Sequence, residues 1–74
     1  MDELDTLGLL CPLPVLKARK RLLRLPVGAM LRVLSDDPVA VIDLPMFCRE
    51  AGHELISHDG TIFVIRRGVG RVAD

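Results

Sequence analysis

The sequence contains no tryptophan and no tyrosine, and its only phenylalanines are Phe47 and Phe63. The chain therefore offers few aromatic rings on which nucleic-acid bases could stack. Net charge is absent as well, because ten basic residues balance ten acidic ones, so overall charge favours no class of partner. No apolar run approaches the roughly 20 residues that a membrane span needs, and we expect no membrane partner.

Cysteine is scarce, with only Cys11 and Cys48 among 74 residues. Small secreted domains that depend on disulfides usually carry more cysteines than this, and the acidic start MDELD lacks the basic and apolar regions of a signal peptide. We therefore expect a cytoplasmic protein. There is no CxxC pair to form a dithiol redox site. The spacing of the cysteines relative to His53 and His58 matches no usual zinc pattern, so no metal site is predicted.

Apolar residues are abundant, at 50% of the chain, which suits one small domain spanning residues 1–74. Their periodicity predicts the order βαβαββ. The expected strands are residues 4–7, 30–35, 53–58 and 61–67. The expected helices are residues 38–51 and a first helix that starts at residue 12 or 13 and ends at residue 24. In the second helix we expect Asp37 to cap the start, Pro38 to take the first position and Gly52 to end it. Pro45 is expected to interrupt this helix, leaving a first turn at 38–42 and a firmer helix at 44–51.

The strand connections predict a two-layer α+β sandwich. Asp59-Gly60 favours a tight hairpin between the last two strands, and the last strand is apolar on both faces, as in the centre of a sheet. Right-handed crossovers place both helices on one face of a mixed four-stranded sheet of order 1-2-4-3, with the fourth strand antiparallel to the others. The pattern leaves open whether the even or the odd residues of 62–65 face the helices. Residues 68–74 are expected to fray.

Cys11 is the candidate nucleophile, because it lies where a loop containing Gly8 meets the start of the first predicted helix. A helix N-terminus stabilises a thiolate and lowers the cysteine pKa, and Lys17 would act in the same direction if its side chain folded back. No histidine or acidic residue has a spacing that marks it as a base for Cys11. Cys48 shares a helical face with Leu44 and Phe47, so we interpret it as a core residue.

The two prolines that follow Cys11 are expected to shape its surroundings. Pro12 suits the first helical position, where its missing N–H has no helical partner, and Pro14 removes another donor from the first turn. The N–H groups of Leu13 and Val15 would remain to hold a sulfur anion. We therefore expect a sulfur that is stabilised without being held tightly.

The first predicted helix has one apolar and one basic side. Its apolar side is expected to comprise Val15, Leu16, Ala18, Leu22 and Leu23. Its five basic residues are half of those in the chain and are Lys17, Arg19, Lys20, Arg21 and Arg24. We interpret Lys17, Lys20, Arg21 and Arg24 as a docking surface for an acidic protein. The alternative is an ordinary solvated helix face.

The segment LDTLGLLCPLPV at residues 4–15 resembles the opening of the TusA/SirA-like sulfur-carrier family, whose hallmark is Cys-Pro-x-Pro after Gly-Leu. The resemblance continues through LPVG at 25–28, SDDP at 35–38, DLP at 43–45, FCR at 47–49 and GHEL at 52–55, so it covers nearly the whole chain. It implies a sulfurtransferase that acts as a persulfide carrier, in which Cys11 takes the sulfur and the residues around it support the site. Those supporting residues are Gly8, Pro12, Leu13 and Pro14.

The resemblance also implies partners and pathways. A donor protein, such as a cysteine desulfurase or a rhodanese, would load Cys11, and a downstream protein would accept the sulfur, with no cofactor beyond the transient persulfide. The sulfur could serve tRNA 2-thiouridine synthesis, sulfur oxidation, molybdenum-cofactor maturation or sulfur uptake. Leu10 and Leu13 replace the basic or polar residue and the acidic residue that members of the tRNA branch carry there, so the rim of this site is more apolar.

A function of another class stays open from the sequence. The protein could be a non-catalytic regulatory or binding module whose basic helix contacts an acidic protein or a nucleic acid. The shortage of aromatic residues favours the acidic protein, and no direct nucleic-acid contact is expected.

Overall fold

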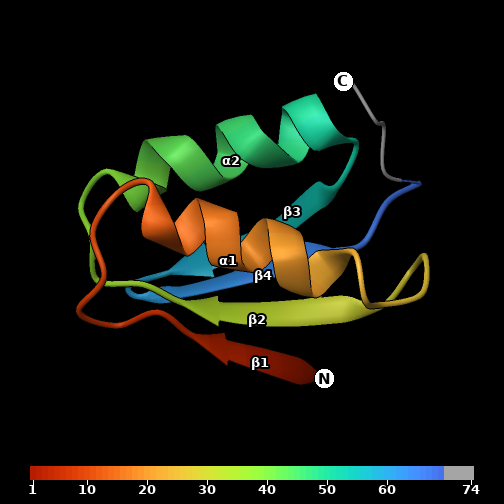
Figure 1. The fold of residues 1–74 in the computed structure, drawn as a ribbon, viewed down its shortest axis with the longest axis horizontal. Coiled ribbons are helices and arrows are strands. Elements are labelled where there is room, and N and C mark those ends of the chain that lie inside the picture. Colours follow the sequence, from red (N-terminus) through yellow and green to blue (C-terminus); the bar gives the residue numbers. More distant parts are fainter. Residues whose placement is uncertain (70–74) are drawn as a thin grey trace.

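The structure, a computed structural model, describes residues 1–69 and has the predicted order βαβαββ (Figure 1). The elements are β1 (Asp2–Asp5), α1 (Leu13–Leu22), β2 (Met30–Leu34), α2 (Ala40–Ala51), β3 (Glu54–Asp59) and β4 (Ile62–Arg66). Within residues 1–69, neither helix is long and apolar enough to cross a membrane.

The four strands form one mixed sheet of order β1-β2-β4-β3. β1 and β2 are parallel, whereas β4 runs antiparallel to both β2 and β3. Both helices lie over the same face of this sheet (Figure 1). The predicted two-layer architecture and strand order are therefore confirmed, including the central position of β4.

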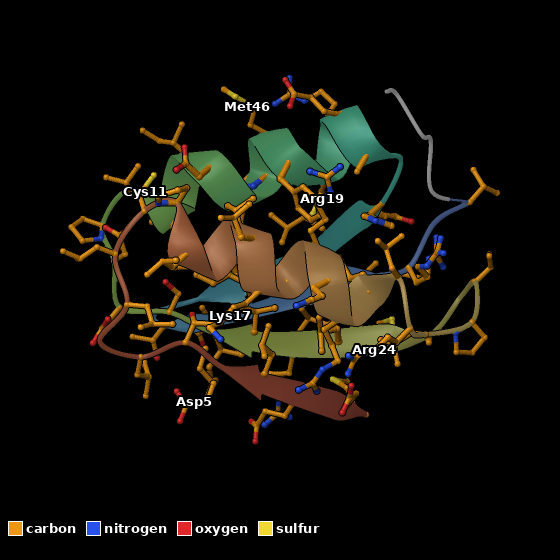
Figure 2. The ribbon with its side chains drawn as sticks, viewed as in Figure 1. Asp5, Cys11, Lys17, Arg19, Arg24 and Met46 are labelled. Carbon is orange, nitrogen blue, oxygen red and sulfur yellow. The ribbon has the colours of Figure 1, made fainter. Side chains whose placement is uncertain are left out.

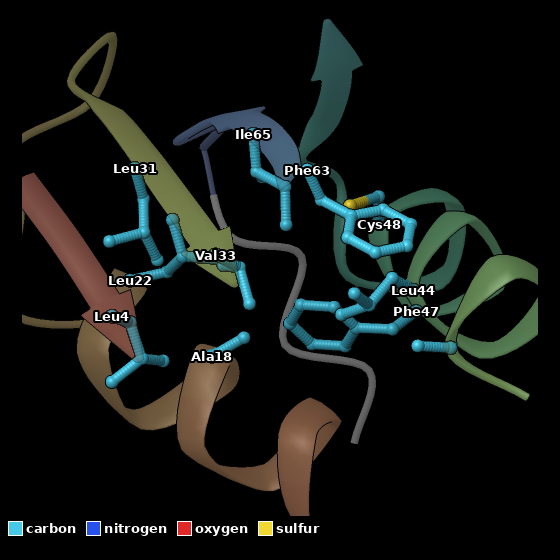
Figure 3. Packing of buried hydrophobic residues seen from close by; sticks show 11 residues of the cluster. Leu4, Ala18, Leu22, Leu31, Val33, Leu44, Phe47, Cys48, Phe63 and Ile65 are labelled. Atoms are coloured by element: carbon cyan, nitrogen blue, oxygen red, sulfur yellow. The ribbon is translucent and has the colours of Figure 1, made fainter. Parts of the chain in front are cut away.

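The core settles which face of β4 meets the helices. Phe63 and Ile65 are buried against them, while the even-numbered residues of β4 lie on the open face. Phe63 is paired with Val33, and Ile65 with Leu31, in the register between β2 and β4. Residues directly opposite each other in a sheet share a face, so these four side chains form one apolar layer, on which α1 and α2 pack (Figure 3).

The buried stripe of α1 differs in part from the predicted one. Pro14, Ala18 and Leu22 are buried at a spacing of four residues, which places them on one line along the helix. Leu16 and Leu23, which were expected in the core, are exposed, so that part of the prediction is wrong. α1 also ends at Leu22 instead of residue 24.

α2 begins later than predicted and is not interrupted. It runs from Ala40 to Ala51 with Pro45 inside it, so the predicted interruption at Pro45 is wrong. An interior proline costs about 3 kcal/mol, but α2 buries the large side chains of Leu44 and Phe47, each worth about 1.5–3 kcal/mol. Packing therefore outweighs the lost hydrogen bond. Gly52 ends the helix in a left-handed conformation, φ 80°, as predicted.

Tertiary contacts shift both ends of the described chain. β1 begins at Asp2, two residues before the predicted strand, and Arg21 of α1 holds Asp2 through an ion pair of 3.0 Å. At the other end, the Gly68 N–H donates to Nδ1 of His53 at 2.9 Å. The predicted fraying is therefore wrong for Gly68, and the part of that prediction covering residues 70–74 lies outside the described residues.

Candidate functional site

Cys11 is exposed on the loop that joins β1 to α1. Figure 2 shows it at one end of the molecule, where the start of α1 lies beside the start of α2. Gly8 has a positive φ of 83° in this loop, a conformation that glycine adopts without steric cost. Of the predicted supporting residues, Gly8 and Pro12 lie in this loop, whereas Leu13 and Pro14 are the first two residues of α1.

Two aspartates that follow β2 fasten this loop. A side-chain oxygen of Asp36 accepts the Gly8 N–H at 3.0 Å. Asp37, which is only 5% exposed, accepts the Cys11 N–H at 2.6 Å with one oxygen and the Val39 N–H at 3.1 Å with the other. A single buried carboxylate therefore ties the cysteine loop to the segment that starts α2. The sequence prediction made Asp37 the cap of a helix with Pro38 at its first position. α2 instead begins at Ala40, with Val39 at its cap position and no side-chain cap, so that prediction is wrong. The contact of Asp37 with the cysteine loop was not predicted.

A third aspartate contacts the sulfur itself. The Cys11 thiol donates to Oδ2 of Asp43, in the first turn of α2, at 2.8 Å. This hydrogen bond raises the pKa of Cys11 above its ordinary value, helped by partial desolvation and by the charges of Asp43 and Asp37. The predicted lowering of the Cys11 pKa is therefore wrong, because Asp43 contacts the sulfur and Asp37 adds a second negative charge close to it.

One of the two backbone donors predicted for the sulfur has another partner. The Leu13 N–H donates to the Leu10 carbonyl at 2.9 Å. Pro12 precedes the helix instead of occupying its first position, and Pro14 is buried against the core. Lys17 does not fold back toward Cys11 but lines a hollow beside Leu4 on the opposite side of α1 (Figure 2).

Apolar side chains surround this polar centre at the surface. Leu10 is 68% exposed and Leu13 is 44% exposed, as expected for a loop that presents its cysteine outward. Val39 and Ile42, at the start of α2, are also exposed, and the bonds from Asp37 and Asp43 bring this part of α2 to the cysteine loop. The sequence prediction recognised the two leucines of this rim but not the two residues of α2.

A groove between α1 and α2 begins at the cysteine site. Its volume is about 270 Å³, and its lining residues are Pro12, Val15, Leu16, Arg19, Asp43, Met46, Phe47 and Glu50. Asp43 belongs to both the groove and the thiol contact, so the groove is continuous with the sulfur. Arg19 and Met46, from the two helices, lie along it (Figure 2). The exposed Leu16 is therefore part of this groove and not of the core.

The predicted docking residues lie on another side of α1 from the sulfur. Lys17, Lys20, Arg21 and Arg24 line a hollow of about 130 Å³ together with Leu4. The Arg21 guanidinium donates to the Asp2 carboxylate at 3.0 Å and to the Glu3 carbonyl at 3.3 Å, so it joins α1 to β1. Among residues 1–69, no ion pair engages the other three basic residues of this hollow.

Cys48 differs from Cys11 in exposure and in its surroundings. It is 2% exposed within the apolar core, as predicted, and burial raises its pKa to about 11. The two histidines are separated as well: His53 accepts the Gly68 N–H, and His58 stacks on Phe63 with the ring centres 4.1 Å apart. Residues 1–69 contain no group of three or more histidine, cysteine or acidic side chains that could hold a metal ion.

Three comparisons with known proteins agree with one another. Residues 2–67 match the model of a family described as sulfurtransferase TusA. A candidate sulfur carrier protein from Archaeoglobus fulgidus is 38% identical over 71 residues, covering 89% of this chain and 92% of that protein. Sulfur carrier protein TusA from Pseudomonas syringae pv. syringae is 44% identical over 55 residues, covering 74% of this chain and 66% of that protein.

The fold has a relative of known structure. The crystal structure of a SirA-like protein from Desulfitobacterium hafniense superposes with a TM-score of 0.68 at 29% sequence identity. The superposition covers 95% of this chain and 99% of that one.

Proposed function

The chain belongs to the TusA sulfurtransferase family, and on that premise we propose that Cys11 carries sulfane sulfur, as a persulfide, from a donor protein to an acceptor protein. Membership of the family assigns the chain to sulfur trafficking. The observation that carries the proposal is the contrast between the two sulfur atoms, since Cys11 is exposed at the end of a loop and Cys48 is buried. A sulfur that must meet another protein's cysteine has to be exposed.

The proposed reaction is an exchange between a thiol and a persulfide. The sulfur of Cys11 attacks the outer sulfur of the donor's R–S–SH group, a new S–S bond forms on Cys11, and the donor leaves as R–SH. Cys11–S–SH then hands its outer sulfur to the acceptor by the same exchange in reverse. Atoms and electrons balance without an external oxidant or reductant. The proposed exchange therefore uses no cofactor beyond the transient persulfide on Cys11.

The surroundings of Cys11 support docking of a protein. The centre of a protein interface is typically apolar, with a polar rim, and the sulfur lies among exposed apolar residues from the loop and from α2. The basic hollow on α1 would steer an acidic donor, such as a cysteine desulfurase or a rhodanese-like protein, without touching the sulfur. We place this exchange in the reducing cytoplasm, because both cysteines are free thiols.

Sulfur loading on the intact protein tests the proposal. We expect incubation with a cysteine desulfurase and cysteine, without reductant, to add one sulfur atom to Cys11, as found by peptide mass spectrometry. Cys11→Ser should abolish loading, whereas Cys48→Ser, the matched control, should keep it. A folded Cys11→Ser protein that still takes sulfur would contradict the proposal.

The second candidate function is that of a binding module, because the basic hollow on α1 offers a charged surface to an acidic partner. A protein that binds an acidic partner through Lys17, Lys20 and Arg24, and binds it equally well after Cys11→Ser, would be a binding module. A carrier would bind its donor through the same face but lose sulfur transfer with Cys11. The two functions are separated by measuring binding and transfer on the same variant.

A further inference from the structure

We propose that Asp43 relays a proton between the Cys11 sulfur and the sulfur of the partner during each exchange. This inference rests on the proposed function, because it concerns the same sulfur, and it adds a second chemical group to the site. Among residues 1–69, Asp43 is the only side chain that forms a hydrogen bond with the Cys11 sulfur.

The geometry places the carboxylate where a proton acceptor must be. The Sγ–Oδ2 distance of 2.8 Å is within the reach required of a general base. Asp43 is partly buried in the first turn of α2 and lines the groove between the helices. Asp37 holds the backbone of Cys11 at 2.6 Å, so the loop carries the sulfur toward Asp43 through a second, independent contact.

Loading illustrates the relay. As Cys11 Sγ forms its bond to the outer sulfur of the donor persulfide, its proton passes to Oδ2 of Asp43. The S–S bond of the donor breaks and leaves a basic thiolate, which takes the proton from Asp43. The carboxylate is thereby restored, and the products are Cys11–S–SH and R–SH.

Unloading needs the same group in the opposite direction. Cys11 is then the leaving sulfur, and a thiol of higher pKa leaves more slowly. The carboxylates that surround Cys11 would therefore hinder release of its sulfur. Asp43 removes this obstacle if it accepts the proton of the incoming acceptor thiol and delivers it to the departing Cys11 sulfur.

Other charged groups face this pair from each neighbouring element. Asp37, in the segment before α2, adds negative charge at Cys11. Arg19 of α1 and Glu50 of α2 line the same groove as Asp43. Asp36 binds Gly8 in the same loop. Among residues 1–69, Glu50 forms no hydrogen bond with the Cys11 sulfur or its loop, so it serves as the matched control for the loss of a carboxylate near the site.

The test compares two reactions of Cys11 that differ in the leaving group. Persulfide exchange with glutathione persulfide releases a basic thiolate that needs a proton, whereas alkylation by iodoacetamide releases iodide, which needs none. Asp43→Asn removes the proton acceptor and the charge. We expect it to slow sulfur loading by about tenfold or more and to speed alkylation at neutral pH, because the thiolate forms more readily. Asp43→Glu should restore loading in part, and Glu50→Gln should change neither rate substantially.

Each outcome of this test either supports or contradicts the proton relay through Asp43. Loading that rises together with alkylation in Asp43→Asn would overturn the relay, because the carboxylate would then only suppress the thiolate. Unchanged rates of both reactions would overturn it too. If Asp43→Asn does not fold, the pH profiles of the native protein decide: loading should fall less steeply than alkylation below the alkylation inflection, and parallel profiles would contradict the relay. Sulfur taken up by Cys11→Ser would overturn the carrier function itself, whatever Asp43 does.

Discussion

The two cysteines both have raised pKa values, but the main cause differs between them. Cys48 lies among apolar side chains, and desolvation alone raises its pKa to about 11. Cys11 is exposed, and its pKa is raised first by the hydrogen bond to Asp43 and only then by desolvation and by charge. The comparison shows that access and a polar partner distinguish the two sulfurs, whereas the direction of the pKa shift does not.

The surroundings of the two cysteines differ in the same way. Around Cys48, α2 buries Leu44 and Phe47 against the sheet (Figure 3). Around Cys11, three aspartates bind the loop while apolar side chains remain exposed. The protein therefore covers its apolar surface at one cysteine and leaves it exposed at the other, where a partner would cover it.

Truncation of the core should have the largest effect on stability. Leu44 is fully buried next to Cys48, and Leu44→Ala should lower the free energy of unfolding by about 2–5 kcal/mol. A domain this small has little stability to spare, so the loss should be evident in urea denaturation followed by circular dichroism. A loss below about 1 kcal/mol would show that the Cys48 region tolerates cavities, contrary to close packing.

The matched change in the other region is Leu13→Glu. Leu13 is 44% exposed beside Cys11, and surface substitutions usually change stability by less than about 0.5 kcal/mol. Transfer of sulfur to or from the natural partner should nevertheless fall, because a charge replaces an apolar group in the rim around Cys11. A large loss of stability would place Leu13 in the core, and unchanged transfer would remove Leu13 from the interface.

Alkylation against pH should separate the two thiols directly. Iodoacetamide should modify Cys11 in the native protein, with an inflection above the ordinary pKa of a free cysteine, because the carboxylates stabilise the protonated thiol. Cys48 should react only after denaturant is added, since it is 2% exposed. Peptide mass spectrometry locates the label. An inflection below the ordinary value would mean that the helix terminus dominates over the three aspartates.

The smallest effect is expected on the basic side of α1. Lys20→Glu with Arg24→Glu should weaken donor-dependent loading modestly while leaving the thermal melt nearly unchanged, because both side chains are exposed. Steering by surface charge is screened by salt, so native loading should slow as ionic strength rises, and variant loading should slow less. An equal response of both proteins to salt would reduce this face to a solvated surface.

Much of the fold was predictable from local pattern. Helical and alternating periodicity, the hairpin signal and the terminating Gly52 yielded the element order and the strand order that the structure shows. The hairpin turn itself was placed one residue too early: Asp59 pairs with Ile62 in the sheet, and the turn residues are Gly60 and Thr61. The errors lie where packing competes with local preference. α2 continues through Pro45 because its buried face outweighs one missing hydrogen bond, and β1 begins at Asp2, where Arg21 reaches across from α1.

The site was predictable only in part. Composition and local position single out Cys11, its prolines and its leucines, because these residues are neighbours in the chain. Asp36, Asp37 and Asp43 are 25 or more residues away in sequence and have no local spacing to Cys11. The topology contained a signal, however: β1 and β2 are parallel neighbours, so the loops that follow them meet at one edge of the sheet.

The sequence by itself determined which thiol is available, because a helix-start cysteine between leucines and prolines differs from one on an apolar helix face. Only the tertiary structure decided the electrostatics of that thiol. A helix terminus acts locally and can be read from the chain, whereas the charge of a carboxylate acts through space, over a distance that depends on how separate segments pack. Parallel pairing of β1 with β2 brings the aspartates to Cys11, and their contacts reverse the predicted direction of its pKa shift.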